Sequence, residues 1–168
     1  LCDRRQRQMC IRDRGYGEDT HRLVKGRPLV LGGVTIPFHL GLLGHSDADA
    51  LTHAAMDAML GACALGDIGK LFPDTDPQYA GVCSLILLAQ VYRHTLAQGY
   101  VLGNLDATIV AQQPKLAPHI PAMRAKLAAA MACCQERISI KATTPEGCGP
   151  EGALESITVR CVCSMEAL

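Results

Sequence analysis

The chain has 168 residues, a formal net charge of zero and 49% hydrophobic residues. This length suits one domain, and the apolar fraction is sufficient for a buried core, which excludes wholesale disorder. A neutral chain lacks the basic field of a general nucleic-acid or anionic-membrane binder, so we expect neither partner. The sequence contains no run of 18 apolar residues, so we expect no transmembrane helix.

Residues 1–14 differ from the rest of the chain. They are rich in Arg and Gln, show no periodicity and lack the apolar stretch of a secretory signal. We interpret them as a disordered or non-native leader and residues 15–168 as the domain. No C-x-x-C pair occurs among the nine cysteines, so we expect reduced core thiols rather than a thiolate zinc site or a disulfide framework. The cysteines inside apolar runs are Cys63, Cys83, Cys161 and Cys163.

The first predicted elements are a hairpin and a helix. Apolar runs at 29–31 and 34–36 flank a Gly-Gly pair, which predicts the hairpin. We expect the helix to have Ser46 as its N-cap and Asp49 as the acidic half of a capping box, and to run toward Gly61.

Later segments alternate between helical and strand periods. Helices are predicted over 84–99 and 118–134, and strands over 105–110, 138–143 and 157–163. No internal repeat or linker interrupts them. The pattern therefore predicts a single α+β domain whose mixed sheet is covered on one face by helices.

Three polar residues are candidate metal ligands. Asp19 and His21 are two positions apart on a segment that we expect to be extended, so their side chains point to the same side. His53 lies on the predicted helix between Asp49 and Asp57 at four-residue spacing, and a neighbouring carboxylate is the usual partner of a metal-ligating imidazole. A polar strand edge and an ordinary core histidine are the alternative interpretations.

Two imidazoles and one carboxylate with an open fourth position describe a catalytic zinc site. Glu146 is a candidate ligand for a hard cation such as Mg²⁺, which takes carboxylates together with waters and substrate phosphates; a solvated loop carboxylate is the alternative. Gly66–Gly69 and Phe72–Asp76 form turns or pocket walls, and Lys115 meets a phosphate or faces solvent. The sequence contains no dinucleotide fingerprint, Walker loop or G-x-S-x-G motif.

The order and spacing of these blocks resemble the 2-C-methyl-D-erythritol 2,4-cyclodiphosphate synthase family of non-mevalonate isoprenoid biosynthesis. The resemblance covers residues 15–165. It rests on Asp19-Thr20-His21, Leu31–Pro37, His45–Asp49 with His53, Gly66–Asp76, Pro114-Lys115 and Lys141–Thr144. It implies a compact homotrimer with sheets packed around the threefold axis and active sites between subunits.

The resemblance also assigns the metals. It implies that Asp19, His21 and His53 bind a divalent ion, normally Zn²⁺. It further implies that Glu146 reaches a second ion, Mg²⁺ or Mn²⁺, which bridges to the substrate diphosphate.

The remaining implied roles concern the substrate. His45 and Thr144 are assigned to transition-state stabilisation, and 111–117 to the cytidine end. The implied substrate-contacting residues are Asp19, His21, His45, Ser46, Asp67, Ile68, Gly69, Phe72, Pro73, Asp74, Thr75, Asp76, Ala111, Pro114, Lys115, Leu116, Ala117, Thr143, Thr144 and Glu146.

The implied reaction suits these residue types. The substrate is 4-diphosphocytidyl-2-C-methyl-D-erythritol 2-phosphate, whose own 2-phosphate attacks the β-phosphorus and releases CMP. Because the nucleophile is already ionised and the leaving phosphate is a good one, charge neutralisation and positioning are the main requirements. This explains why no Ser/His/Asp or Cys/His arrangement is present. The implied location is the bacterial cytoplasm rather than the plastid stroma, because no clear transit peptide appears.

The chain also departs from the family pattern. Glu18 stands where an apolar aromatic is usual, and we expect a carboxylate beside Asp19 that tightens metal binding or repels phosphate. Pro145 removes a backbone N–H donor from the loop before Glu146, and Pro150 and Ala153 replace a common aromatic and Arg. Two other functions stay open: a catalytically silent trimeric cytidine-nucleotide-binding protein and a zinc hydrolase of phosphate esters.

Overall fold

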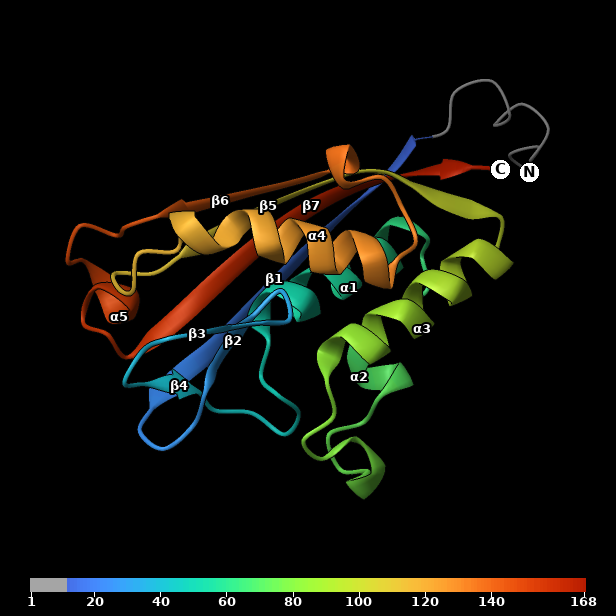
Figure 1. Cartoon of the computed structure of the whole chain (residues 1–168). Coiled ribbons are helices and arrows are strands. Elements are labelled where there is room, and N and C mark those ends of the chain that lie inside the picture. Colours follow the sequence, from blue (N-terminus) through green and yellow to red (C-terminus); the bar gives the residue numbers. More distant parts are fainter. Residues whose placement is uncertain (1–11) are drawn as a thin grey trace.

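The structure is a computed structural model that describes residues 12–168, and its main feature is a five-stranded sheet with helices on one face (Figure 1). The strands are β1 (Arg12–Val24), β4 (Gly41–Leu42), β5 (Tyr100–Val110), β6 (Ile138–Thr143) and β7 (Ser156–Ala167), in the order β4-β1-β7-β5-β6. Only β5 and β6 run parallel, while the other neighbours are antiparallel. The prediction of an α+β domain with a mixed sheet is confirmed.

The other elements cover or flank this sheet. They are the hairpin β2 (Leu29–Leu31) and β3 (Val34–Ile36), the helices α1 (Ala50–Ala62), α2 (Ile68–Leu71), α3 (Ser84–Ala97), α4 (Ile120–Ala130) and α5 (Gly149–Gly152), and the 3₁₀ turns η2 (Pro77–Tyr79), η3 (Ala117–His119) and η4 (Gln135–Arg137). No helix of the described residues is long and apolar enough to cross a membrane.

Strand β1 begins earlier than the predicted domain boundary. It pairs with β7 from Arg12 onward, so residues 12–14 belong to the sheet and not to a leader. The rest of the predicted leader lies outside the described residues.

Helix α1 lies directly on β1 because the strand has no side chains at the crossing. A Cβ atom added to Gly15 would lie 1.8 Å from the carbonyl oxygen of Ala58, and one added to Gly17 would lie 2.1 Å from that of Ala54. Ala54 and Ala58 are fully buried. The small residues on both elements therefore let the two backbones touch, which fixes the distance between strand and helix.

The start of α1 differs from the prediction. Asp49, not Ser46, is the N-cap, and its carboxylate accepts from the backbone N–H of Thr52 at 3.0 Å. The same buried carboxylate accepts from the N–H groups of Gly32 at 2.8 Å and Gly33 at 2.7 Å, so it also anchors the hairpin. A capping-box pattern cannot reveal these long-range donors, which is why the position of the cap was wrong.

Two other predicted elements have different bounds. The expected helix over 118–134 is divided into η3 and α4, which ends at Ala130 before the left-handed Ala132 (φ 48°). Strand β5 begins at Tyr100, and a register shift between Leu102 and Asn104 divides it.

The cysteines that we expected in the core fall into three classes of burial. Cys161 and Cys163 are buried, Cys63 is half-buried, and Cys83 is exposed at the N-cap of α3. The expectation of a buried Cys83 was therefore wrong. All seven cysteines of the described residues are free thiols.

Candidate functional site

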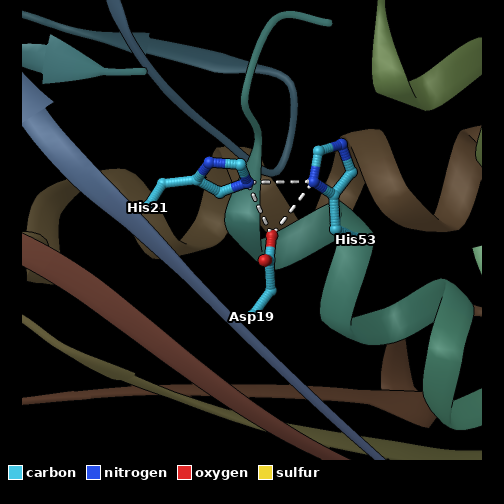
Figure 2. A group of neighbouring side chains, drawn as sticks. All are labelled: Asp19, His21 and His53. Atoms are coloured by element: carbon cyan, nitrogen blue, oxygen red, sulfur yellow. Dashed lines mark hydrogen bonds and ion pairs between the residues drawn. The ribbon is translucent and has the colours of Figure 1, made fainter. Parts of the chain in front are cut away.

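Three side chains converge where β1 meets α1. Asp19 and His21 come from the strand and His53 from the helix (Figure 2). Oδ2 of Asp19 lies 2.9 Å from Nε2 of His21 and 3.0 Å from Nδ1 of His53, and the two nitrogens are 3.3 Å apart. Within the described part of the chain, no other group of three or more His, Cys, Asp or Glu side chains has geometry suited to a metal ion. The predicted convergence of these residues is confirmed.

The donor set and its spacing fit a zinc ion. Zinc bonds to nitrogen and oxygen are about 2.0–2.1 Å long, so neighbouring ligands of a tetrahedral ion are roughly 3.3 Å apart. The three measured separations are close to this value or slightly shorter. With one carboxylate and two imidazoles in place, a fourth position stays open, as in catalytic zinc sites.

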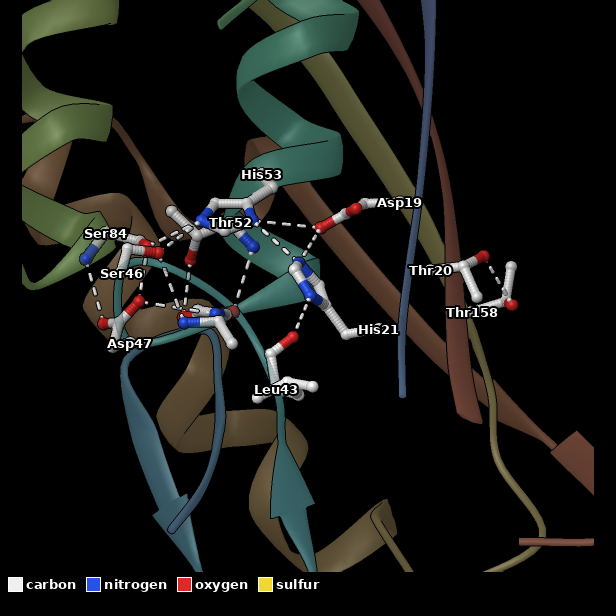
Figure 3. A network of polar contacts seen from close by, with 12 residues as sticks. Asp19, Thr20, His21, Leu43, Ser46, Asp47, Thr52, His53, Ser84 and Thr158 are labelled. Atoms are coloured by element: carbon white, nitrogen blue, oxygen red, sulfur yellow. Dashed lines mark hydrogen bonds and ion pairs between the residues drawn. The ribbon is translucent and has the colours of Figure 1, made fainter. Parts of the chain in front are cut away.

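The ring nitrogens that face away from the cluster also have partners. Nδ1 of His21 donates to the carbonyl of Leu43 at 2.7 Å, which leaves Nε2 free to bind a metal. Nε2 of His53 lies between the hydroxyls of Ser84 at 2.9 Å and Ser46 at 3.2 Å (Figure 3). The histidines therefore present different ring nitrogens to the same centre.

The carboxylates expected beside His53 serve other purposes. Asp49 caps α1, and Asp57 accepts from the backbone N–H of Ile68 at 2.8 Å, which holds α2 against α1. Burial raises the pKa of Asp57. The prediction that Asp49 or Asp57 supports His53 was wrong, because helical spacing does not show which tertiary donors attract each carboxylate.

Charge in the cluster is distributed unevenly. Burial favours the neutral form of Asp19, but hydrogen bonds with His21 and His53 outweigh it and hold the pKa of that carboxyl well below its usual range. Burial likewise opposes the charge on His21, yet the Asp19 carboxylate raises the pKa of this imidazole. The site is therefore built around an ionised carboxylate, as a divalent cation requires.

The cluster borders a cavity of about 490 Å³. Its lining includes eight predicted substrate residues: His21, His45, Ser46, Ile68, Gly69, Phe72, Pro73 and Asp74. His45 lines this cavity from the loop before α1 rather than from the helix N-terminus, because α1 begins only at Ala50. Its Nε2 lies 3.2 Å from the carbonyl oxygen of Asp76.

Four other predicted residues do not line this cavity: Asp19, Asp67, Thr75 and Asp76. Asp67 caps α2 by accepting from the backbone N–H of Lys70, and Asp76 caps η2 by accepting from the backbone N–H of Gln78. The carboxylates of Asp67 and Asp76 thus shape the loop that carries Phe72–Asp74.

Three lining residues were not predicted from the sequence: Gly44, Tyr79 and Leu87. Tyr79 packs edge-to-face on Phe72 with ring centroids 5.3 Å apart. Leu87 is a buried residue of α3, and an apolar residue on a helix gives no sign in the sequence that a cavity lies beside it.

A second cavity of about 310 Å³ is lined by seven further predicted substrate residues. They are Ala111, Pro114, Lys115, Leu116, Ala117, Thr143 and Thr144, joined by Gln112 of the predicted 111–117 segment and by the unpredicted Pro118 and Ala142. Glu146 does not line it, but accepts a hydrogen bond from the Thr144 hydroxyl. None of the described residues lines both cavities, so a single chain keeps the two halves of the predicted substrate site apart.

Comparison with known proteins agrees with this geometry. The model of the YgbB family matches residues 13–166. The chain belongs to the YgbB family. It is 59% identical over 148 residues to the 2-C-methyl-D-erythritol 2,4-cyclodiphosphate synthase of Moorella thermoacetica, covering 88% of this chain and 91% of that protein. It is 58% identical over 152 residues to the synthase of the same name from Geobacter sulfurreducens, covering 90% and 97% of the two chains.

Solved structures give the same result. A 2C-methyl-D-erythritol-2,4-cyclodiphosphate synthase in its CDP-bound form matches this YgbB chain with a TM-score of 0.83 and 42% identity, covering 91% and 99% of the two chains. The bifunctional IspDF from Campylobacter jejuni matches with a TM-score of 0.89 and 40% identity, covering 92% of this chain but 42% of the longer protein.

One departure from the YgbB pattern has a clear structural outcome. Glu18 faces the opposite side of the sheet from Asp19, where it accepts from the Tyr16 hydroxyl and from Nε of Arg160 at 3.1 Å. The Tyr16 and Arg160 hydrogen bonds lower the pKa of Glu18. Our expectation that Glu18 acts on the metal or on the substrate phosphate was wrong, because adjacent residues of a strand point to opposite faces.

Proposed function

We propose that this YgbB chain converts 4-diphosphocytidyl-2-C-methyl-D-erythritol 2-phosphate into 2-C-methyl-D-erythritol 2,4-cyclodiphosphate and CMP, which makes it a phosphorus–oxygen lyase of the bacterial cytoplasm. The observation that carries this proposal is the convergence of Asp19, His21 and His53 beside the larger cavity. High identity to synthases of that name supports the assignment.

In the proposed reaction, an oxygen of the substrate's 2-phosphate forms a bond to the β-phosphorus. The bond from that phosphorus to the oxygen shared with the α-phosphate breaks, and the electron pair leaves with CMP. No proton has to be removed from the nucleophile, so the protein must chiefly bring anions together and hold them in line.

Asp19, His21 and His53 would hold a zinc ion, and Glu146 would reach Mg²⁺ or Mn²⁺. When bound, these ions supply positive charge against the diphosphate. His45 and Thr144 are proposed to stabilise the transition state by donating hydrogen bonds to phosphoryl oxygens.

The cavity walls suggest how the substrate is divided between the two sites. Phe72, Tyr79 and Leu87 give the larger cavity an apolar wall suited to the methylerythritol carbons. Lys115 and the neighbouring backbone of the smaller cavity suit the cytidine diphosphate end.

The separation of the cavities supports a homotrimer with shared active sites, in which one subunit supplies the metal centre and its neighbour the cytidine pocket. The sheet face opposite α1 offers a surface for this assembly where α5 does not cover it (Figure 1). On it, Tyr16 and Val162 pair across β1 and β7 although they are 56% and 48% exposed, an apolar exposure typical of an interface.

The direct test measures CMP release by the purified full-length chain supplied with Zn²⁺ and Mg²⁺. We expect CMP and a cyclic product in equal amounts, and loss of both after chelation or in His53→Ala. His94→Ala is the matched control, because His94 is exposed on α3 and lines neither cavity. A metal-loaded protein that releases no CMP would refute the proposal, and tight CDP binding without turnover would identify a silent nucleotide-binding protein.

A further inference from the structure

The metal-facing nitrogen of His53 depends on what happens at the other side of its ring. A neutral imidazole carries one proton, so Nδ1 is free to bind a metal only when the proton is on Nε2. Two hydroxyls contact Nε2, those of Ser84 at 2.9 Å and Ser46 at 3.2 Å. A hydroxyl can donate or accept, so neither contact alone decides where the proton lies.

The carboxylate of Asp47 removes this ambiguity for Ser84. Oδ1 of Asp47 lies 2.5 Å from Oγ of Ser84, and Oδ2 accepts from the backbone N–H of Ser84 at 2.9 Å (Figure 3). A carboxylate only accepts, so the single hydroxyl proton of Ser84 points to Asp47. Oγ of Ser84 can then only accept from His53, which requires a proton on Nε2.

We propose that Ser84 and Asp47 are positioning residues that hold the His53 proton on Nε2 and thereby keep Nδ1 ready for the metal. The relay runs from the half-buried Asp47 through Ser84 to His53, which are 0% and 9% exposed. It opposes Asp19, whose Oδ2 lies 3.0 Å from Nδ1 and would attract the proton there. This inference rests on the proposed function of the metal centre.

The hydrogen-bond donors around Asp47 allow the relay to be tested with an isosteric substitution. Its carboxylate accepts from three donors: the hydroxyl and the N–H of Ser84, and the N–H of Asp49 at 3.3 Å. In Asp47→Asn, the amide NH₂ must face one of these donors in either orientation. If it faces the hydroxyl, Ser84 becomes a donor toward Nε2 of His53 and favours a proton on Nδ1, where it blocks the metal.

The experiment compares Asp47→Asn and Ser84→Ala with Ser156→Ala in the full-length protein. Ser156 is also a buried serine, and its hydroxyl has no hydrogen-bond partner among residues 12–168. Zinc affinity is measured by chelator competition, and unfolding curves show that each variant is folded. We expect both relay variants to bind zinc 10- to 100-fold more weakly, the usual effect of removing a partner of a metal-ligating histidine, and Ser156→Ala to bind it as the wild type does.

A second measurement distinguishes positioning from general loosening. In the metal-free protein, ¹⁵N shifts of the His53 ring report the fraction that carries its proton on Nε2. We expect this fraction to fall in Asp47→Asn. Zinc affinities equal to those of the wild type and of Ser156→Ala, or an unchanged tautomer fraction, would overturn the relay alone. A wild type that binds no zinc would overturn the proposed metal centre together with it.

Discussion

A single methyl group at Gly17 is expected to disturb the metal centre, because Gly17 faces α1 on the same side of β1 as Asp19. The added Cβ would lie 2.1 Å from the carbonyl oxygen of Ala54 and 2.7 Å from the nitrogen of Ala58. An ordinary contact needs about 3.4 Å, so strand and helix must separate by roughly 1.3 Å. His53 precedes Ala54 on the same helix, whereas metal sites tolerate changes of only about 0.2 Å.

We therefore expect Gly17→Ala to weaken zinc binding at least tenfold and to lower the free energy of unfolding by about 2–3 kcal/mol, as overpacking does. Chelator competition and denaturant unfolding of the metal-free protein measure the two effects. Gly61→Ala is the control, because its Cβ would lie 3.9 Å from the carbonyl oxygen of Tyr16, an ordinary contact distance. Alanine there should stabilise α1 by about 0.5–1 kcal/mol. Unchanged affinity and stability in Gly17→Ala would refute the reasoning.

Three further predictions address the assembly, the core and the pH dependence of the site. Mixing inactive His53→Ala and Thr144→Ala subunits should restore about a quarter of wild-type CMP release. In randomly mixed trimers, about a quarter of the interfaces join an intact metal centre to an intact cytidine pocket of the neighbouring subunit. No recovery of CMP release would exclude a shared site. Asp49→Ala should cost about 3 kcal/mol in urea unfolding, since it leaves buried hairpin and helix N–H groups without an acceptor, and a loss below 1 kcal/mol would contradict that role. Asp19 raises the pKa of His21 above the usual value for a histidine, so protons compete with zinc at a higher pH than at an ordinary histidine. The zinc affinity should therefore rise as the pH increases through that raised pKa. A zinc affinity that is constant from pH 6 to 8 would disprove this.

The fold was largely predictable because its main signals are local. Strands β6 and β7 were predicted from the alternation of apolar and polar residues. The hairpin was predicted from its Gly-Gly pair. Both patterns involve only residues that are neighbours in the sequence. The cap of α1 was misplaced because the donors that hold Asp49, the N–H groups of Gly32 and Gly33, are far away in the chain.

The site shows the same division between local and tertiary information. The spacing of Asp19 and His21 predicted their shared direction, while their meeting with His53 depends on the glycines that let α1 approach β1. Tyr79 was missed because an aromatic residue in a turn has no spacing signal.

The two histidines offer different nitrogens to the centre, and this has a consequence for redesign. A glutamine amide oxygen can occupy the place of an Nε2 atom, and an asparagine oxygen that of an Nδ1 atom, so the matched replacements are His21→Gln and His53→Asn. Together with Asp19 they would form an all-oxygen triad, which prefers hard ions such as manganese or magnesium to zinc. The opposite pairing would leave one oxygen short of the ion and the other too close.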